Sequence, residues 1–258
     1  MKNIYIIINP AAGADYPVLS VLNRKLKGSP MKIKILVTQK NSDIKKFTLE
    51  ALKKEVDIVA VYGGDGTIME AAKILYKTNT PLAILPGGTA NILAKELQIP
   101  SLETAIDIFL RKKITVHKMD VGLCNSIPFF LRVSIGLMAD MVIQTDTKLK
   151  KTVGRLAYPI TAIQKLTQIQ PTTYSISIDQ KFIEDTGYSL VVANSGNLGF
   201  PGITVHPEVS ITDSLLNVFL IKNALDPRTQ TLTHWKGKRI SVLQSEPYHQ
   251  ITRDDDIV

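Results

Sequence analysis

The sequence is poor in the side chains that form disulfides and zinc sites. Among 258 residues there is one cysteine, Cys124, so no disulfide can form within the chain. The four histidines are dispersed and do not form a cluster with metal-ligand spacing: His117, His206, His234 and His249. We therefore expect neither a zinc centre nor dithiol redox chemistry.

Long apolar runs and several well-known catalytic motifs are also missing. There is no run of about 18 apolar residues, and the start "MKNIYIIINP" reaches Asn9 and Pro10 after a core too short for a signal peptide. These features predict a cytoplasmic protein without a membrane-spanning segment. No G-x-x-x-x-G-K-[ST], no G-x-G-x-x-G after the first strand and no G-x-S-x-G occurs, so a nucleotide site would be of another type and a serine hydrolase is not expected.

The charge is unbalanced toward cations. Lys and Arg number 31 against 23 Asp and Glu, a net charge of +8, which favours anionic partners such as nucleotides, anionic lipid surfaces or nucleic acid. The lone Trp235 and the scattered other aromatics do not alternate with cations along a strand. Nucleic-acid binding therefore has no support beyond the net charge.

The first part of the chain alternates short β-branched runs with amphipathic helical stretches. From Asn3 to about Val116 the apolar runs are "IYIIIN", "KIKILVT", "DIVAVY" and "LAILP", separated by stretches with helical periodicity. Continuous apolar strands with helices between them are typical of a parallel sheet covered on both faces. The pattern predicts a doubly wound α/β domain over residues 1–118, with ligands bound beyond the carboxyl ends of its strands.

The rest of the chain has a different texture. Strand-like runs follow one another from "VHKMDVGLC" and "PFFLRVSIG" to "YHQITRD", with one long helical candidate at "GRLAYPITAIQKLTQI". Consecutive strands with few helices predict an antiparallel, sandwich-like or barrel-like β domain over residues 119–258. Because no flexible Gly/Ser linker separates the halves, we expect the two domains to pack with a cleft between them.

Three glycine-rich turns follow strands of the α/β domain and precede helices. They are "NPAAG" (Asn9 to Gly13), "GGDGT" (Gly63 to Thr67) and "PGGTAN" (Pro86 to Asn91). Glycine lets backbone N–H groups approach a phosphate, and a helix N-terminus adds unpaired donors. Thr67, Thr89 and Asn91 can cap their helices or donate to a phosphate oxygen. One such turn is weak evidence, but three at one sheet edge favour a phosphate site.

Asp65 is the unexpected residue of the second turn. A bare carboxylate would repel a phosphate in a poorly solvated site, and a divalent cation between them removes that conflict. Mg²⁺ is the natural choice because it is held by carboxylates, phosphates and water. The structural alternative, that Asp65 caps the helix that follows it, is about equally good on this motif alone.

The order and spacing of these motifs resemble one enzyme family. "NPAAG", "GGDGT", "PGGTANILAKEL", "MDVG", "KKTVGRLAYP", "VVANSGNLG", "ITDSLLNV" and "QITRDDDIV" resemble, over essentially the whole chain, the diacylglycerol kinase catalytic-domain family of bacterial lipid kinases. "GGDGT" alone is shared with NAD kinases and phosphofructokinases. The resemblance implies transfer of the γ-phosphoryl group of ATP, with Mg²⁺, to a hydroxyl of diacylglycerol or a related lipid.

The resemblance also implies roles for particular residues. A catalytic role falls on Asp65 and Asp256. The metal would be held by the Asp213 side chain and the carbonyls of Ser210 and Leu215. The nucleotide and its phosphates would contact Asn9, Pro10, Ala11, Ala12, Gly13, Thr38, Gly63, Gly64, Asp65, Gly66, Thr67, Ile68, Met69, Glu70, Gly88, Thr89 and Asn91.

Each role in the second half has a structural alternative. Asp254, Asp255 and Asp256 could form a solvated acidic tail, and Asp213 could be an ordinary turn residue. The basic segment 148–155 could meet an anionic membrane or begin a solvated helix. The sequence has Ser214 and Asp255 where the family usually has glycine, and it ends at Val258, where relatives usually continue for a further strand.

Three functions are therefore compared. The first is a lipid kinase acting at a membrane surface, cytoplasmic or peripheral at the inner face. The second is an NAD kinase-like enzyme with a water-soluble product, and the third is a catalytically weak nucleotide- or lipid-binding relative. The lipid and the oligomeric state, a homodimer being one option, are left open by the sequence.

Overall fold

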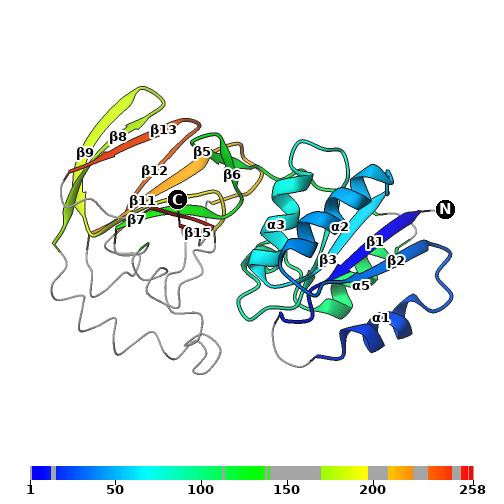
Figure 1. The fold of residues 1–258 in the computed structure, drawn as a ribbon. Coiled ribbons are helices and arrows are strands. Elements are labelled where there is room, and N and C mark those ends of the chain that lie inside the picture. The colour runs from blue at the N-terminus through cyan, green and yellow to red at the C-terminus, as the bar shows by residue number, and fades with distance from the viewer. Residues whose placement is uncertain are drawn as a thin grey trace. The chain divides into compact units, whose positions relative to one another are not determined.

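The computed structural model describes most of the chain as two compact units. Its described residues are 2–12, 16–111, 114–136, 139, 170–196, 209–222, 232–245, 251–254 and, by backbone alone, 256–257. The units comprise Met1–Lys118 and Met119–Val258. Figure 1 labels most of their helices and strands. The predicted long helix at 154–169 and the basic segment 148–155 lie outside the described residues.

The first unit is built on a parallel sheet. Its strands are β1 (Asn3–Ile8), β2 (Lys32–Val37), β3 (Ile58–Gly63) and β4 (Leu82–Pro86). They lie in the order β2-β1-β3-β4, and each neighbouring pair is parallel. β3 is buried along its whole length, as its uninterrupted apolar sequence predicts. The expected α/β architecture is confirmed.

Helices cover both faces of this sheet (Figure 1). They are α1 (Val18–Leu26), α2 (Ser42–Lys53), α3 (Asp65–Leu75), α4 (Ile92–Glu96) and α5 (Leu102–Phe109). On one face, Ile4, Ile6 and Ile8 of β1 form a buried core with apolar residues of α1 and α5. α2 and α3 pack beside each other on the opposite face. The period-2 alternation of strand side chains supplies an apolar layer to both faces.

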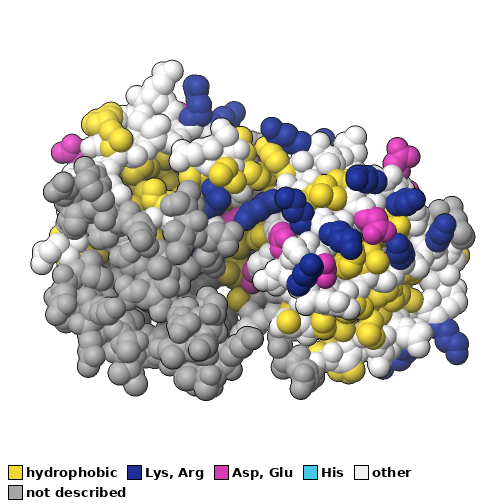
Figure 2. Space-filling model, in the orientation of Figure 1, with side chains coloured by type: hydrophobic (Ala, Val, Ile, Leu, Met, Phe, Trp, Pro, Cys, Tyr) yellow, Lys and Arg dark blue, Asp and Glu magenta, His cyan; other side chains and the backbone are white. Residues whose placement is uncertain are grey.

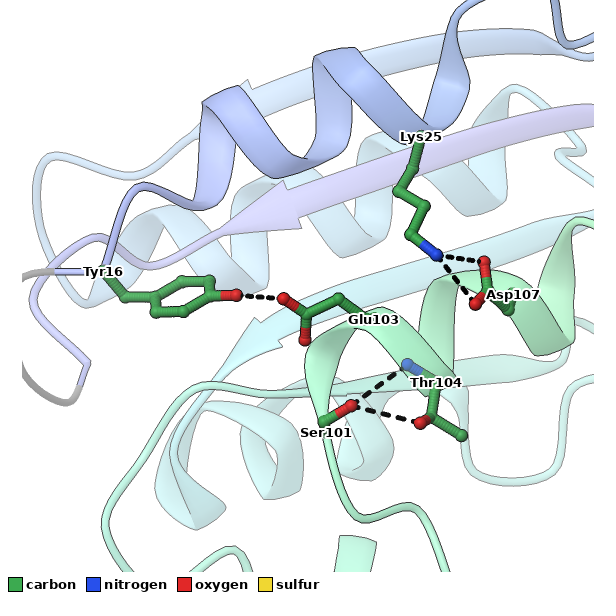
Figure 3. A network of polar contacts seen from close by, with 6 residues as sticks. All are labelled: Tyr16, Lys25, Ser101, Glu103, Thr104 and Asp107. Carbon is green, nitrogen blue, oxygen red and sulfur yellow. Dashed lines mark hydrogen bonds and ion pairs between the residues drawn. The ribbon is translucent and has the colours of Figure 1, made fainter.

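A polar network on the surface joins α1 to α5 (Figure 3). The Ser101 side chain caps α5 by accepting the Thr104 N–H at 3.1 Å. Lys25 of α1 forms an ion pair with Asp107 of α5, with an N–O distance of 2.7 Å. The Tyr16 hydroxyl donates to Glu103, which raises the pKa of the tyrosine and lowers that of the carboxyl. The start of α5 is thus joined to the segment before α1 through Tyr16, and its second half is joined to α1 through Lys25.

The second unit is antiparallel throughout its described strands. The strands of its large sheet are β7 (Arg132–Gly136), β10 (Ser189–Ala193), β11 (Leu216–Ile221), β12 (Leu232–Gly237), β14 (Ile251–Arg253) and β15 (Asp256–Ile257). This six-stranded sheet has the order β12-β11-β10-β7-β14-β15. The other strands are β5 (Gly122–Cys124), β6 (Ile127–Phe129), β8 (Thr172–Ile178), β9 (Lys181–Gly187) and β13 (Ile240–Gln244).

The large sheet shares a core with the three-stranded sheet β13-β8-β9. Leu190, Val218 and Leu220 of the large sheet cluster with Tyr174 and Ile176 of β8, all fully buried. This packing confirms the predicted β-rich second part. Two predicted strands were wrong in extent: Val116–Cys124 is a strand only from Gly122, and Pro128–Gly136 is divided between β6 and β7. None of the described helices is long and apolar enough to cross a membrane.

Asp179 joins two neighbouring turns of this unit. It begins the β8–β9 turn, in which Asp179 and Gln180 both have positive φ angles, 45° and 80°. Its carboxylate accepts the N–H groups of Lys238 and Arg239, each at 2.8 Å, in the connection between β12 and β13. These hydrogen bonds lower the pKa of the Asp179 carboxyl from its ordinary value of 3.8. The charged form is therefore stabilised by folding.

We expect a pH-dependent loss of stability from this contact. Because the pKa in the folded state is depressed, the contribution is fully present above the unfolded-state value and is lost as the pH falls through the folded-state value. Asp179→Asn should lower the melting temperature near neutral pH, and its difference in melting temperature from wild type should narrow as the pH falls below 3.8, the ordinary value for an aspartate. Fluorescence of Trp235, the single tryptophan, reports the unfolding of this unit. Glu184→Gln on β9 is the charge-matched control. If Asp179→Asn lowers the melting temperature by the same amount at every pH, the assignment to the ionised carboxylate is contradicted.

Candidate nucleotide-binding site

The candidate site lies at the carboxyl edge of the parallel sheet. In the order β2-β1-β3-β4, the chain moves from β1 to one side and then returns to form β3 on the other side. Such a reversal leaves a crevice beyond the adjacent strand ends, where α/β proteins bind ligands. All three glycine-rich turns follow β1, β3 and β4 at this edge. The expectation that they lie together is met.

Asn9 connects the first turn to the second. Its side-chain amide donates to Thr67 Oγ1 at 2.9 Å, and its Oδ1 accepts the Ala11 N–H at 3.1 Å. The backbone N–H of Asn9 also bonds the Tyr62 carbonyl, at 2.9 Å. Thr67 therefore does not cap its own helix, but holds the turn after β1 against the start of α3. Pro10, Ala11 and Ala12 follow in this turn, and Gly13 lies outside the described residues.

The start of α3 supplies the backbone N–H donors of the second turn. Gly64 is the N-cap with extended backbone, and the first intrahelical bond joins Ile68 N–H to its carbonyl. A helix leaves the N–H groups before this bond without an intrahelical acceptor, and here they include those of Gly66 and Thr67. The side chains of Ile68 and Met69 are buried in the core. Because α3 uses that face for packing, the nucleotide contact predicted for Ile68 and Met69 stays a prediction that only their backbone groups are placed to make.

Asp65 does not cap the helix that it begins. Its Oδ1 accepts the N–H of Leu93, at 3.3 Å, near the start of α4 in the turn after β4. The simple capping alternative is wrong, since the N-cap of α3 is Gly64 and has no side chain. The carboxylate instead joins the second turn to the third and places a negative charge at the sheet edge. Glu70, also predicted here, lies one turn further along α3.

The third turn is closed by Asn91. Its Oδ1 accepts the Gly88 N–H at 2.8 Å, and its Nδ2 donates to the Gly88 carbonyl at 2.7 Å. Asn91 has φ 48°, a left-handed conformation that asparagine tolerates. The helical pattern of the sequence predicts a helix that begins at Thr89. Because Asn91 is left-handed, α4 begins only at Ile92. Thr89 is exposed, and its capping role is not seen.

Close backbone contacts explain two of the glycines. A Cβ atom on Gly88 would lie 2.5 Å from Gly64 Cα, and one on Gly87 would lie 2.5 Å from the Tyr62 ring. The second and third turns therefore touch through their backbones, where only glycine fits. Burial raises the pKa of the Tyr62 hydroxyl, which belongs to the core beneath the turns. The sequence analysis assigned these glycines to close approach of a phosphate, and the structure also uses them for contact between the two turns and with Tyr62.

Thr38 directly follows β2 at the same edge. Its side chain is only 6% exposed, and its N–H bonds the Ile8 carbonyl at 2.9 Å. The following turn is held by Asp43, a residue that the motif search missed. The Asp43 carboxylate accepts the N–H groups of Gln39 and Lys40 at 2.9 and 3.2 Å. The Gln39 bond lowers the pKa of this carboxyl, which keeps it ionised. The available signal was an acidic residue in the first turn of a helix that follows a strand end.

The second unit holds the predicted metal-binding loop. The Asp213 Oδ1 accepts the Leu215 N–H at 3.0 Å, and Ser210 Oγ accepts the Thr212 N–H at 3.2 Å. Each hydrogen bond joins residues two positions apart and so stabilises a local turn. This agrees with the structural alternative for Asp213, an ordinary turn residue. Asp120, from the "MDVG" motif, joins this loop by accepting the Ser214 N–H at 2.6 Å. No group of three or more His, Cys, Asp or Glu side chains suited to a metal occurs among the described residues.

Ser214 occupies a conformation suited to glycine. Its φ is 60°, in the left-handed region, where a side chain costs roughly 1 kcal/mol. The hydrogen bond from its N–H to Asp120 compensates for part of this cost. The change from the usual glycine is thus accommodated by the loop.

The acidic end of the sequence is built into the β structure at Asp254. Its carboxylate accepts three backbone N–H groups, those of Phe130 and Leu131 at 2.8 Å and of Arg132 at 3.1 Å. The solvated-tail alternative is therefore wrong for Asp254. These bonds also explain the break between β6 and β7, since they occupy donors that a continuous strand would use. Asp256 pairs with Arg253 in the β14–β15 register, and its side chain lies outside the described atoms.

Two arginines are buried beside this hairpin. Arg132 of β7 is 3% exposed and Arg253 of β14 is 9% exposed. Within the described part of the chain, Nε and Nη1 of Arg253 have no hydrogen-bond partner. A buried guanidinium is costly unless it is paired, so this position favours an anion. Sequence reasoning missed both arginines, because only the strand pairing shows that they are buried.

Comparison with known proteins agrees with this geometry. Residues 3–124 match the model of the diacylglycerol kinase catalytic domain, and residues 132–236 match that of the YegS C-terminal NAD kinase beta sandwich-like domain. A Bacillus subtilis diacylglycerol kinase is 27% identical, covering 87% of this chain and 75% of its own. A probable lipid kinase YegS-like protein from Stenotrophomonas maltophilia is 29% identical, covering 80% and 69%.

Other matches extend over the whole chain. An uncharacterized protein of Synechocystis, sll0036, is 28% identical, and the match covers 100% of this chain but 66% of that protein. A crystal structure of a diacylglycerol kinase from Bacillus anthracis covers 100% of this chain and 90% of its own, with a TM-score of 0.75 and 23% identity. At that identity the structural match shows the fold alone. The two domain models carry the family assignment: residues 3–124 belong to the diacylglycerol kinase catalytic domain family and residues 132–236 to the YegS C-terminal domain family.

Proposed function

We propose that this protein is an ATP-dependent lipid kinase that transfers the γ-phosphoryl group to a hydroxyl of diacylglycerol or a related lipid. The observation that carries the proposal is the interlocked set of turns after β1, β3 and β4. Asn9 holds the first turn to Thr67, and Asp65 holds the second to Leu93. The set presents helix N–H groups at a sheet edge in a chain that matches a kinase catalytic domain.

The residues present suit phosphoryl transfer. This reaction needs positioning and charge neutralisation more than covalent chemistry, so backbone N–H groups and a cation supply most of what is required. The N–H groups of Gly66 and Thr67 would bind phosphate oxygens, and the Asp65 carboxylate would supply negative charge for a Mg²⁺ ion bound with the nucleotide. In the second unit, carboxylate and carbonyl oxygens of Asp213, Ser210 and Leu215 are the hard donors that Mg²⁺ prefers. Bound Mg²⁺ neutralises charge that develops on the phosphates.

The chemical step then follows from the groups assigned to it. The lipid hydroxyl oxygen attacks the γ-phosphorus, the bond between that phosphorus and the β,γ-bridging oxygen breaks, and ADP leaves. The hydroxyl proton passes to the Asp256 carboxylate, which acts as general base at the position where the resemblance implies a catalytic acidic residue. Asp254 holds the turn before Asp256 to the backbone of residues 130–132. A fixed β14–β15 hairpin suits a general base that has to accept a hydrogen bond from the lipid hydroxyl.

The test is transfer of labelled γ-phosphate from ATP to a lipid extract. Wild-type protein should give an organic-soluble product, and Asp65→Asn should lower kcat by about a hundredfold or more. Asparagine keeps an acceptor for the Leu93 N–H, so this change removes the charge and leaves the melting temperature close to that of wild type. Asp107→Asn, which removes an exposed carboxylate on α5 in the same unit, is the matched control and should retain activity.

Two outcomes would reject the proposed lipid kinase activity, and a third would reject the role assigned to Asp65. A labelled product that stays in the aqueous phase would identify an NAD kinase-like or other small-molecule kinase. Calorimetric binding of ATP without turnover on a broad lipid panel would identify a binding protein that retains the fold. Undiminished lipid phosphorylation by Asp65→Asn would remove the carboxylate from the mechanism.

A further inference from the structure

Two large apolar side chains are far more exposed than the fold requires. Of the described residues, Phe182 of β9 is 71% exposed and Leu243 of β13 is 74% exposed. Both lie on the outer face of the three-stranded sheet β13-β8-β9, opposite the face that forms the core. Phe182 pairs with Ser177 in the β8–β9 register, and Leu243 pairs with Ser175 in the β13–β8 register. The surroundings of these side chains on β8 are therefore small and polar.

Phe182 differs from Leu243 in its charged neighbours. It follows the β8–β9 turn, where Lys181 is exposed, and the exposed Lys238 and Arg239 occupy the neighbouring β12–β13 connection. Asp179 fastens the two turns together through its bonds to the Lys238 and Arg239 N–H groups, both 2.8 Å long. We call Lys181, Phe182, Lys238 and Arg239 the turn cluster. Figure 2 shows dark-blue and yellow side chains on this unit where Figure 1 places the turns.

The turn cluster has the composition of a membrane contact. An aromatic side chain enters the boundary between headgroups and acyl chains, and nearby cations are attracted to anionic headgroups. The only carboxylate fixed within the two turns, Asp179, is directed to backbone N–H groups and so leaves the three cations available for a surface. A rigid pair of turns also loses little conformational freedom on docking. The net charge of +8 favours approach to such a surface.

We propose that the turn cluster docks the protein on an anionic lipid surface, with Phe182 inserted and the three cations over the headgroups. The inference rests on the proposed function, because a lipid kinase has to reach a lipid surface, and it adds the place at which the protein makes that contact. The proposed contact lies at the β8–β9 turn and the neighbouring connection between β12 and β13. The segment 148–155, which the sequence also offered for this role, lies outside the described residues.

Co-sedimentation with vesicles tests the proposal without ATP or turnover. Vesicles of phosphatidylcholine containing phosphatidylglycerol should bind the wild-type protein, and pure phosphatidylcholine should bind it much less. Neutralising the cations in a Lys181→Gln, Lys238→Gln, Arg239→Gln triple variant should lower the partition coefficient by about a hundredfold. Phe182→Ser should lower it by about tenfold. Leu243→Ser, an equally exposed apolar residue on the same face, should leave binding unchanged.

Two results would overturn the assignment. Equal loss of binding in Leu243→Ser and Phe182→Ser would place the contact on the whole sheet face and not at the turn cluster. A dimer in sedimentation velocity that Phe182→Ser dissociates, with vesicle binding unchanged, would identify this face as an interface between two copies of the chain.

The experiment also separates this inference from the proposed function. With lipid dispersed in detergent, Phe182→Ser should phosphorylate substrate at the wild-type rate, because no vesicle surface has to be reached. Vesicle binding without any lipid phosphorylation would reject the kinase and retain the docking surface. Lipid phosphorylation in detergent without binding to anionic vesicles would do the reverse.

Discussion

Gly88→Ala is expected to lower ATP affinity by about a hundredfold or more, a loss near 2.8 kcal/mol. The added Cβ would lie 2.5 Å from Gly64 Cα and 3.1 Å from Asn91 Oδ1. Neither neighbour is the free end of a flexible side chain, so the turn after β4 must move away from the start of α3. That movement separates the partners Asp65 and Leu93 and disturbs the N–H groups assigned to the phosphates. Overpacking of this kind also costs about 1–3 kcal/mol of stability.

Titration calorimetry measures the affinity, and scanning calorimetry measures the melting temperature. Gly66→Ala is the matched control for folding, because a Cβ there meets nothing within 4 Å. Alanine is also the better helix former within α3, so this variant should melt no lower than wild type. If Gly88→Ala binds ATP with wild-type affinity and melts at the wild-type temperature, the contact between the two turns has no part in nucleotide binding.

Asp254→Ala is expected to destabilise the second unit by about 3 kcal/mol, since a buried N–H without an acceptor costs about 1–3 kcal/mol. The change removes the acceptor for the N–H groups of Phe130, Leu131 and Arg132. Asp254 is half-buried, so water replaces part of what is lost and the three costs do not simply add. Activity should fall further than stability does, because the turn that leads to Asp256 is no longer fixed.

Urea unfolding followed at Trp235 measures this loss in the unit where it occurs. Asp254→Asn keeps one oxygen acceptor and should lose about half as much. Asp213→Ala, an exposed carboxylate with a single local N–H partner, should cost far less. An unfolding free energy for Asp254→Ala within about 0.5 kcal/mol of wild type would show that water satisfies these N–H groups equally well.

The fold could be predicted from the sequence because its signals are local. The alternation of "IYIIIN" and "DIVAVY" with amphipathic stretches predicts parallel strands covered by helices, and β1, β3 and the flanking helices follow it. The glycine-rich turns were also placed at the correct edge, since each directly follows a strand. Elements whose limits depend on a distant partner were placed less well. The β6–β7 break is one example, because Asp254 is more than 120 residues away from the donors that it occupies.

The candidate site shows the same division. Asn9, Asp65 and Asn91 could be selected by residue type and position, but what their side chains contact could not be predicted. Asn91 closes its own turn, and Asp65 reaches the helix after the next strand. Asp43 belongs to no distinctive motif, and the "MDVG" motif by itself gives Asp120 no role. Both roles become visible only through the N–H groups that the two carboxylates accept. A carboxylate's neighbours are set by tertiary structure, which periodicity does not encode.

The bond between Asn9 and Thr67 has an evolutionary consequence. A residue of the first turn and a residue of α3, 58 positions apart, are joined by a hydrogen bond 2.9 Å long at the reversal of strand order. Losing either side chain leaves the other with an unmatched polar group, so the second loss costs less than the first. We therefore expect the two positions to covary. Lineages that abandon one of these side chains should tend to abandon the other, even where both turns remain rich in glycine.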